Sequence, residues 1–303
     1  MTETERIVAK GIIPETFLQE EIRCDFLVDE KRKKIWTVCL DLLLEIDRVC
    51  KKHGLRYFLM YGSLLGAIRH KGFIPWDDDV DIIMFRKDYD VLTKLGEEFT
   101  APYFLQTPET DPNFCNSIIK LRNSNTCFFS KYHGYRKFNS GLLIDVFPLE
   151  DAMPETEEAR WDEINQLNIL NSLWLKMPSP YKTRHDIDRI AKYSNIDCRA
   201  NLARINEIAT MYNDPSTKYV GQLVNTVYSF DREMFLRESF DNTIYADFEG
   251  LKLPIPAGYD QILKTTYGDY MEFPPAEKRG SWHEMAYLDP DMSFSDYMKS
   301  IGL

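Results

Sequence analysis

The stretch that decides the fold is YFLMYGSLLGAIRHKGFIPWDDDVDIIMFR, residues 57–86. Its first apolar run, 57–61, predicts a buried strand that stops at Gly62-Ser63, and residues 63–70 favour a short helix. A turn and an acidic cluster follow. The cluster leads directly into a second apolar run at 82–85, so the whole stretch predicts a strand, a helix and another strand.

This arrangement of residue types indicates phosphate and metal chemistry. A Gly62-Ser63 corner between a strand and a helix leaves backbone N–H groups free to bind a phosphate. Asp79 and Asp81 are two residues apart at the opening of a strand, so both side chains point to one face, roughly 6.5–7 Å apart along the chain. Two carboxylates placed in this way can share a hard divalent cation such as Mg²⁺.

A simpler interpretation applies to part of the acidic cluster. Asp77 and Asp78 fit a solvated turn as well as they fit a site. Asp79 and Asp81 fit a turn poorly because they border the apolar residues of the second strand, where unpaired carboxylates are costly. A metal ion or a cationic ligand would remove that cost.

Residues 62–81, GSLLGAIRHKGFIPWDDDVD, resemble the LicD family of phosphotransferases, which are related to fukutin and fukutin-related protein. The match is long and ungapped, and the resemblance extends over nearly the whole chain from about residue 29. It implies an α+β fold of the nucleotidyltransferase type, with a mixed β-sheet core flanked by helices and a helical insert or cap. It also implies a third carboxylate on a later strand.

That third carboxylate is expected at Asp145. Residues 141–148, GLLIDVFP, predict an apolar strand that carries one acid, and a lone acid within such a strand needs a partner. By resemblance, Asp145 completes the catalytic and metal-binding set with Asp79 and Asp81. Two roles are open for it, namely binding a metal ion or acting as the general base on an acceptor hydroxyl.

Three residues near the acidic cluster are candidates for substrate binding. Arg69 can clamp a phosphate with two hydrogen bonds, although a surface salt bridge to a nearby aspartate is the alternative. For the neighbouring His70, substrate binding and a surface contact are equally expected. Trp76 can stack on a base or a sugar, but a tryptophan before an acidic turn is equally expected to be a packing residue.

Further candidates lie later in the chain. Lys120 and Arg122 alternate with apolar residues in a predicted strand at 117–122, so they share a face that can receive a pyrophosphate, or that simply faces solvent. A matching basic pair in the LicD family favours the first interpretation. Tyr267 opens a LicD-like run, YGDYMEFPP, and the resemblance places it at the donor site, although a C-terminal packing helix explains it as well.

Composition bounds the remaining possibilities. The 303 residues carry a formal net charge of −11, which argues against nucleic acid or an anionic membrane as a general partner. The N-terminus does not resemble a signal peptide and no apolar run reaches the length of a membrane span, so we expect a cytoplasmic protein that meets the inner face of the membrane only through its acceptor. Six cysteines without Cys-x-x-Cys spacing predict free thiols.

The expected organisation has four parts. An irregular N-terminal arm (1–28) precedes the nucleotidyltransferase-like catalytic core (29–153), a helical insert (154–213) and a C-terminal part that completes the donor site (214–303). Three elements outside the site are predicted with particular clarity: a helix at 29–53 with Asp29 as its cap and Gly54 as its end, a helix at 157–177, and a hairpin at 243–255.

The resemblance implies a specific reaction. It predicts transfer of phosphocholine from CDP-choline to a sugar hydroxyl of a cell-surface glycan precursor, of teichoic acid or lipopolysaccharide type, with Mg²⁺ or Mn²⁺ as cofactor. Transfer of another polyol phosphate, such as ribitol phosphate, from a CDP-linked donor is an alternative. So is a nucleotidyltransferase that moves a nucleoside monophosphate and releases pyrophosphate. A non-catalytic nucleotide-binding scaffold is disfavoured by the intact acidic trio.

Overall fold

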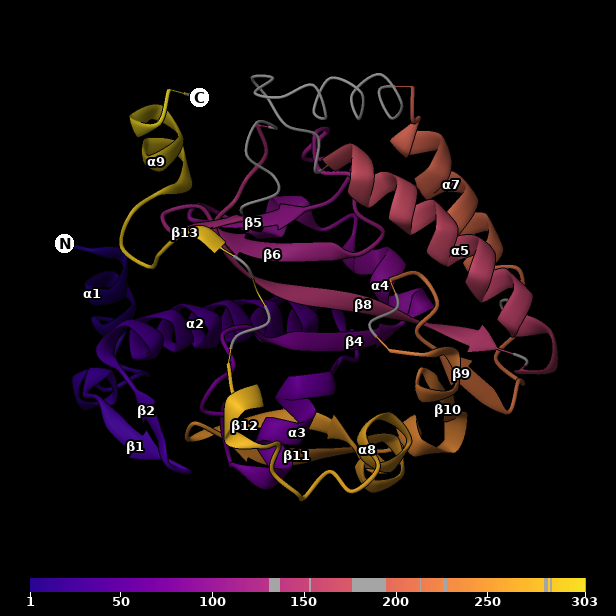
Figure 1. Cartoon of the computed structure of the whole chain (residues 1–303), viewed down its shortest axis with the longest axis horizontal. Helices are drawn as coiled ribbons and strands as arrows, with labels where there is room; N and C mark the ends of the chain where they lie inside the picture. The colour runs from indigo at the N-terminus through magenta and orange to yellow at the C-terminus, as the bar shows by residue number, and fades with distance from the viewer. Residues whose placement is uncertain are drawn as a thin grey trace.

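A mixed β-sheet flanked by helices forms the centre of the molecule (Figure 1). The computed structural model describes residues 1–130, 137–152, 154–175, 195–212, 214–225, 228–280, 283 and 285–302. The α+β architecture expected from the sequence is confirmed, and the layers of sheet and helix place the acidic residues of the 77–81 region at the start of a central strand.

The central sheet is organised around its longest strand, β8 (Leu142–Ala152). Strand β4 (Asp81–Phe85) runs parallel to β8, and all other pairs of the sheet are antiparallel. The remaining strands are β3 (Phe58–Leu59), β5 (Tyr103–Gln106), β6 (Ile119–Asn123), β9 (Tyr219–Gly221) and β10 (Met234–Leu236), with the order β10-β9-β8-β4-β3 and with β6 and β5 continuing from β8.

The long helix α2 (Glu30–His53) forms as its sequence predicts. The Asp29 side chain accepts a hydrogen bond from the backbone N–H of Arg32 at 2.8 Å, and Gly54 ends the helix in the left-handed region with φ 67°. Its buried face carries Trp36, whose ring stacks on Phe73 at 4.7 Å. The helix packs against β6 and β8, and therefore fixes the sheet and the site stretch together.

Helix α3 (Tyr61–Arg69) begins two residues earlier than the prediction of 63–70. Tyr61 has φ 48°, so the chain turns sharply before Gly62 and the preceding strand is confined to the two residues of β3. The backbone N–H groups of Ser63 and Leu64 both donate to the Met60 carbonyl, which makes Met60 the capping residue. Gly62 and Ser63 therefore lie within the first turn of the helix rather than before it.

Other helices surround the sheet. Helix α4 (Arg86–Leu92) follows β4 directly, and a 3-10 turn (Gly96–Glu98) comes after it. Helices α5 (Pro154–Leu175) and α7 (Cys198–Ala209) pack against each other at one end of the molecule (Figure 1). The first agrees with the helix predicted at 157–177. Within the helical insert expected at 154–213, residues 198–209 are helical as well, and residues 176–194 lie outside the described ranges.

The N-terminal residues contain more structure than the irregular arm expected from the sequence. Helix α1 (Glu3–Val8) packs on α2, and strands β1 (Glu21–Arg23) and β2 (Phe26–Val28) form a hairpin. Ile7 and Val28 are buried in the main core. The apolar residues of this segment are widely spaced, so the sequence shows no helical or strand periodicity that would predict α1, β1 and β2.

The C-terminal region adds a hairpin, a helix and a further strand pair. Strands β11 (Thr243–Phe248) and β12 (Leu251–Pro256) form the hairpin predicted at 243–255 and turn at Glu249-Gly250. The other elements are α8 (Tyr259–Tyr267), β13 (Met285–Asp289), which pairs with β7 (Cys127–Ser130), and α9 (Phe294–Ser300).

All six cysteines are free, in agreement with the sequence. Among the described residues, the search for a helix of sufficient length and apolarity to cross a bilayer finds none.

Candidate active site

Two of the predicted acids lie side by side on neighbouring strands. Asp81 of β4 is paired in parallel register with Asp145 of β8, and the Asp145 backbone N–H donates to the Val80 carbonyl at 2.9 Å. On the adjoining strand β6, Lys120 stands opposite Asp145 and forms an ion pair with its carboxylate. Three charged side chains from three strands therefore form one row across the sheet.

The residues before Asp81 bring further carboxylates to this row. Asp78 is only 3% exposed, and its carboxylate is 2.9 Å from Nδ1 of His283. Nε2 of the same imidazole is 3.6 Å from an oxygen of Asp79. The interpretation of Asp78 as a solvated turn residue is therefore wrong, because the C-terminal His283 covers it.

Helix α2 fixes the backbone of Asp77, and helix α3 lies against its carboxylate. Its carbonyl accepts hydrogen bonds from the Arg32 guanidinium at 2.8 Å and the Trp36 indole at 2.9 Å. Its carboxylate lies against Gly62, where a Cβ atom would come within 2.6 Å of Oδ2. A side chain larger than hydrogen at position 62 would thus displace the Asp77 carboxylate, so the glycine permits this close approach.

The turn at Gly62 and Ser63 provides both a brace and a set of donors. The Ser63 hydroxyl accepts a hydrogen bond from the Asp81 backbone N–H at 2.9 Å. The backbone N–H of Ser63 donates to the Met60 carbonyl. Within the described residues, the N–H groups of Tyr61 and Gly62 at the start of α3 make no hydrogen bond. The phosphate cradle predicted at Gly62-Ser63 thus has its available backbone donors at positions 61 and 62.

The electrostatics of the cluster are unfavourable without a cation. Burial, followed by repulsion from the neighbouring carboxylates, raises the pKa of Asp77 and of Asp81 well above the ordinary value, and burial also raises the pKa of Asp79. Burial alone would lower the pKa of His283, but the adjacent Asp78 and Asp79 raise it to about 9. Crowded carboxylates of this kind are stabilised by a divalent ion.

The donor set suits a metal ion. Asp78, Asp79 and His283 each offer one ligand atom, and these atoms lie within 4.8 Å of one another. Carboxylate oxygens favour Mg²⁺ or Mn²⁺, whereas the imidazole nitrogen adds affinity for transition metals such as Mn²⁺ over Mg²⁺. The described part of the chain can therefore hold a divalent ion beside the row of charged residues.

A group of tyrosines borders the acids. The Tyr228 hydroxyl donates to the Tyr267 hydroxyl at 3.0 Å, and the two rings are nearly perpendicular with centroids 5.5 Å apart. Burial, Tyr228 and the charges of Asp81 and Asp77 together raise the pKa of Tyr267 well above its ordinary value. Tyr267, which the sequence proposed for the donor site, therefore lies near the carboxylates.

Arg69, His70 and Trp76 gather around Phe273 rather than around the carboxylates. The Arg69 guanidinium donates to the Tyr270 and Glu272 carbonyls at 2.7 and 2.9 Å and lies over the Phe273 ring. His70 stacks on the same ring, and burial lowers its pKa to about 4. Trp76 is 6% exposed and meets Phe273 edge to face. Trp76 is therefore a packing residue in this structure. Arg69 donates hydrogen bonds to backbone carbonyls and not to an aspartate.

Arg122 also differs from the expected phosphate-binding position. It is 4% exposed, and its guanidinium donates to the Gln106 side chain and to the Gly141 carbonyl. Burial lowers its pKa to about 10. The alternating pattern correctly predicted a shared face with Lys120, but Arg122 is occupied inside the protein and only Lys120 contacts an acid of the site.

Several site residues had no recognisable pattern in the sequence. His283 stands alone in the C-terminal part of the chain. Glu233, fully buried, accepts a hydrogen bond from the Tyr61 hydroxyl at 2.6 Å and another from the Tyr228 backbone N–H at 3.0 Å. The contacts of His283 with Asp78 and of Glu233 with Tyr61 join segments more than 150 residues apart, so only the acidic neighbours of Asp78 offered a local signal.

Comparisons with known proteins agree with the sequence resemblance. Residues 54–176 match the family model described as LicD/FKTN/FKRP, nucleotidyltransferase domain. The lipopolysaccharide cholinephosphotransferase LicD of Haemophilus influenzae is 26% identical over 261 residues, which cover 83% of this chain and 96% of that protein. The human ribitol 5-phosphate transferase FKRP is 48% identical over 59 residues, which cover 18% of this chain and 12% of that protein.

Proposed function

Since the chain belongs to the LicD family and is a transferase of substituted phosphate groups, we propose that it moves phosphocholine from CDP-choline to a sugar hydroxyl of a cell-surface glycan precursor. The acceptor would be of the lipopolysaccharide or teichoic acid type. The observation that carries the proposal is the register pairing of Asp81 with Asp145, with Asp79 and the α3 N-terminus beside them.

The acidic residues would hold the metal. Asp79, Asp81 and Asp145 are the proposed ligands, and Asp78 and His283, whose ligand atoms lie within 4.8 Å of one another and of an Asp79 oxygen, would add to the set. Mg²⁺ or Mn²⁺ bound there would neutralise the charge of the donor pyrophosphate.

The remaining roles belong to the residues of the chain. The N–H groups of Tyr61 and Gly62 would hold phosphate oxygens at the helix N-terminus, and Lys120 would add a positive charge beside Asp145. Asp145 would accept the proton of the sugar hydroxyl. The sugar oxygen then bonds to the phosphorus that carries choline, the bond from that phosphorus to the bridging oxygen breaks, and CMP leaves.

The tyrosine pair Tyr228 and Tyr267 would contact the donor head group. Choline is a quaternary ammonium, which proteins bind through aromatic faces, and Tyr228 and Tyr267 lie near Asp81. A ribitol phosphate donor is the second candidate, supported by the similarity to the ribitol 5-phosphate transferase. Transfer of a nucleoside monophosphate would instead release pyrophosphate, so the identity of the product separates these reactions.

The first prediction tests the acidic site. Asp79→Asn should abolish CMP release from CDP-choline, by at least ~100-fold, because it removes a metal ligand while preserving the shape of the side chain. Circular dichroism should show an intact fold, and Mn²⁺ titration followed by electron paramagnetic resonance should show weakened metal binding.

The matched control is Asp162→Asn, an exposed aspartate of α5 outside the site, which should behave as wild type. Near-normal turnover of Asp79→Asn would overturn the metal assignment. Turnover with CDP-ribitol but not with CDP-choline would keep the enzyme class and replace the donor.

A further inference from the structure

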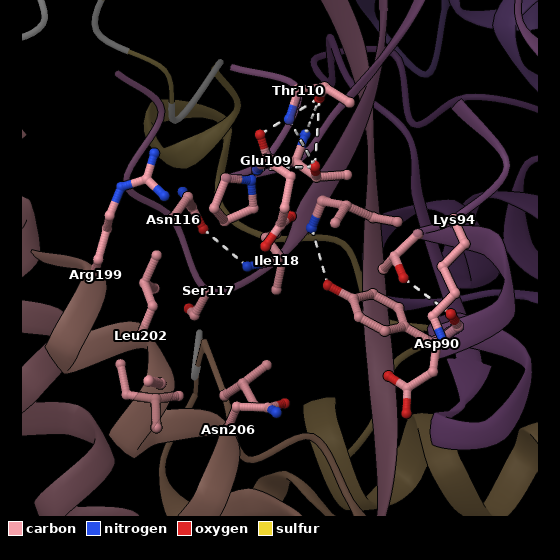
Figure 2. A pocket seen from close by; sticks show the side chains of 18 of the residues that line it. Asp90, Lys94, Glu109, Thr110, Asn116, Ser117, Ile118, Arg199, Leu202 and Asn206 are labelled. Carbon is pink, nitrogen blue, oxygen red and sulfur yellow. Dashed lines mark hydrogen bonds between the residues drawn. The ribbon is translucent and has the colours of Figure 1, made fainter. Parts of the chain in front are cut away.

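A cavity of about 630 Å³ lies apart from the acidic row, between α4, the loop at 107–119 and α7. Figure 2 shows Arg199, Leu202 and Asn206 of α7 on one side, Asp90 and Lys94 on the other, and Ser117 and Ile118 between them. Its volume is within the range of small-molecule sites, roughly 300–1,000 Å³. Nothing in the proposed reaction has used this space so far.

The wall of the cavity has two chemical characters. One part is apolar and the other carries hydroxyl and amide groups, as suits a ligand with C–H faces and hydroxyl edges. The apolar residues are Ile118, Leu202, Ala203, Ile205 and Val224, and the hydroxyl and amide residues are Thr93, Thr107, Thr110, Asn116, Ser117 and Asn206.

Ser117 supplies an independent indication of a ligand. Its hydroxyl oxygen is shielded from solvent, belongs to a residue of the cavity wall, and has no hydrogen-bond partner among the described residues. A buried hydroxyl without a partner costs free energy, and a turn of the Ser117 side chain about χ1 would bring this hydroxyl to a ligand in the cavity. Its neighbours are satisfied, since the Asn116 side chain accepts from the Ile118 N–H and the Tyr89 hydroxyl accepts from the Ile119 N–H.

The charges around the cavity are close to balance. Arg86 forms ion pairs with the buried Glu150 and with Asp90, and with Lys94, Arg199 and Glu109 this makes three cations against three carboxylates. A nucleotide or pyrophosphate would need an excess of positive charge, which this wall does not offer. The combination of neutral hydrogen-bonding groups, an apolar face and balanced charge points to a neutral polyhydroxylated ligand.

We propose that this cavity binds a neutral saccharide unit of the acceptor, away from the reacting hydroxyl. Ser117 precedes Lys120 by three residues, roughly 10 Å of extended chain, and Lys120 is paired with Asp145. A short oligosaccharide can span that distance, so one unit can occupy the cavity while another presents its hydroxyl to Asp145. This part of the inference rests on the proposed function, whereas saccharide binding itself does not.

The test compares two alanines of α7 that are both exposed. Ala203 lines the cavity and Ala200 does not, so Ala203→Trp should fill the space while Ala200→Trp serves as the matched control. Saturation-transfer NMR with lactose, maltose and N-acetylglucosamine should show binding to wild type and to Ala200→Trp. We expect at least ~10-fold weaker binding to Ala203→Trp.

Ser117→Ala provides a second variant that does not depend on added bulk. Because it deletes an unsatisfied hydroxyl, it should leave the free energy of unfolding unchanged or slightly higher, yet weaken saccharide binding several-fold. In the transfer reaction, Ala203→Trp should raise the KM for the glycan acceptor and leave CDP-choline hydrolysis by water unchanged.

Three results would overturn the proposal: no binding of any of the three saccharides, equal binding by Ala203→Trp and wild type, or binding of CMP in this cavity. Failure of phosphocholine transfer with intact saccharide binding would instead count against the proposed function alone.

Discussion

At the scale of single residues, Gly62 sets how closely α3 approaches the acidic cluster. A Cβ atom at this position would lie 2.6 Å from Oδ2 of Asp77, well inside van der Waals contact. We expect Gly62→Ala to move the Asp77 carboxylate, to cost about 1–3 kcal/mol by overpacking, and to lower transfer at least ~10-fold. Urea unfolding and CMP release measure the two effects.

Gly96→Ala is the control for this substitution. Its added Cβ would meet only the Thr110 methyl group, at 3.7 Å, which is ordinary contact. Wild-type stability and activity are therefore expected. If Gly62→Ala kept full activity and Mn²⁺ affinity, the position of Asp77 would have no bearing on the site.

The residues of the site differ in how far sequence could predict them. The sequence predicts that Asp79 and Asp81 share one face of a strand, but β4 begins at Asp81 and Asp79 lies before it, so the spacing argument does not by itself place Asp79. Asp145 was expected from a lone acid in an apolar strand, and its register with Asp81 now gives that expectation a geometry. His283 and Glu233 reach the site through tertiary contacts only, so no local pattern could reveal them.

At the scale of elements, Arg69 at the end of α3 anchors the segment that follows α8. Its guanidinium holds the Tyr270 and Glu272 carbonyls and covers Phe273. We expect Arg69→Met to increase hydrogen–deuterium exchange in residues 268–280 at least ~10-fold, because two charge-assisted hydrogen bonds are lost. Exchange in β4 and β8 should remain at the wild-type level.

A phosphate clamp at Arg69 would give a different result. In that case Arg69→Met would raise the KM for CDP-choline without changing exchange in residues 268–280. Arg48→Met is a suitable control, since Arg48 pairs with Glu45 on the exposed side of α2 and touches neither segment. An unchanged exchange pattern in Arg69→Met would show that the anchor is dispensable.

Elements whose bounds are set by nearby residues were predicted from the sequence, whereas elements that depend on partners far along the chain were not. Helix α2 has an aspartate cap, a regular apolar face and a terminal glycine, which together specify its bounds. The start of α3 was predicted two residues too late because Tyr61 adopts an unusual φ of 48°. In this conformation the Tyr61 hydroxyl donates a buried hydrogen bond to Glu233. Strand β7 was missed because its partner β13 lies more than 150 residues later.

At the scale of the whole molecule, the N-terminal helix joins parts of the chain that are far apart. The Glu3 carboxylate accepts hydrogen bonds from the side chains of Asn123 and Asn125 at 2.6 and 3.1 Å, and Thr4 donates to Asp291 through both its N–H and its hydroxyl. Helix α1 therefore connects α2, the turn after β6 and the segment after β13. The packing of α1 against these segments therefore contributes to the free energy of unfolding of the whole chain.

The charge of Glu3 makes this contribution dependent on pH. Burial opposes ionisation, but hydrogen bonds from Arg6, Asn123 and Asn125 outweigh it and hold the pKa of Glu3 below its ordinary value of 4.5. A carboxyl group whose pKa is lower in the folded state contributes stability that is complete above pH 4.5 and is lost as the pH falls through the folded-state pKa.

Glu3→Gln should accordingly lower the free energy of unfolding at neutral pH by about 1–2 kcal/mol, since a charged acceptor becomes neutral in a buried network. The difference from wild type should shrink as the pH falls below 4.5, where wild-type Glu3 begins to take up a proton. Urea unfolding at a series of pH values measures this. Glu15→Gln, at an exposed position, should show no such convergence. A constant difference at every pH would mean that Glu3 stabilises the docked helix by its shape and not by its charge.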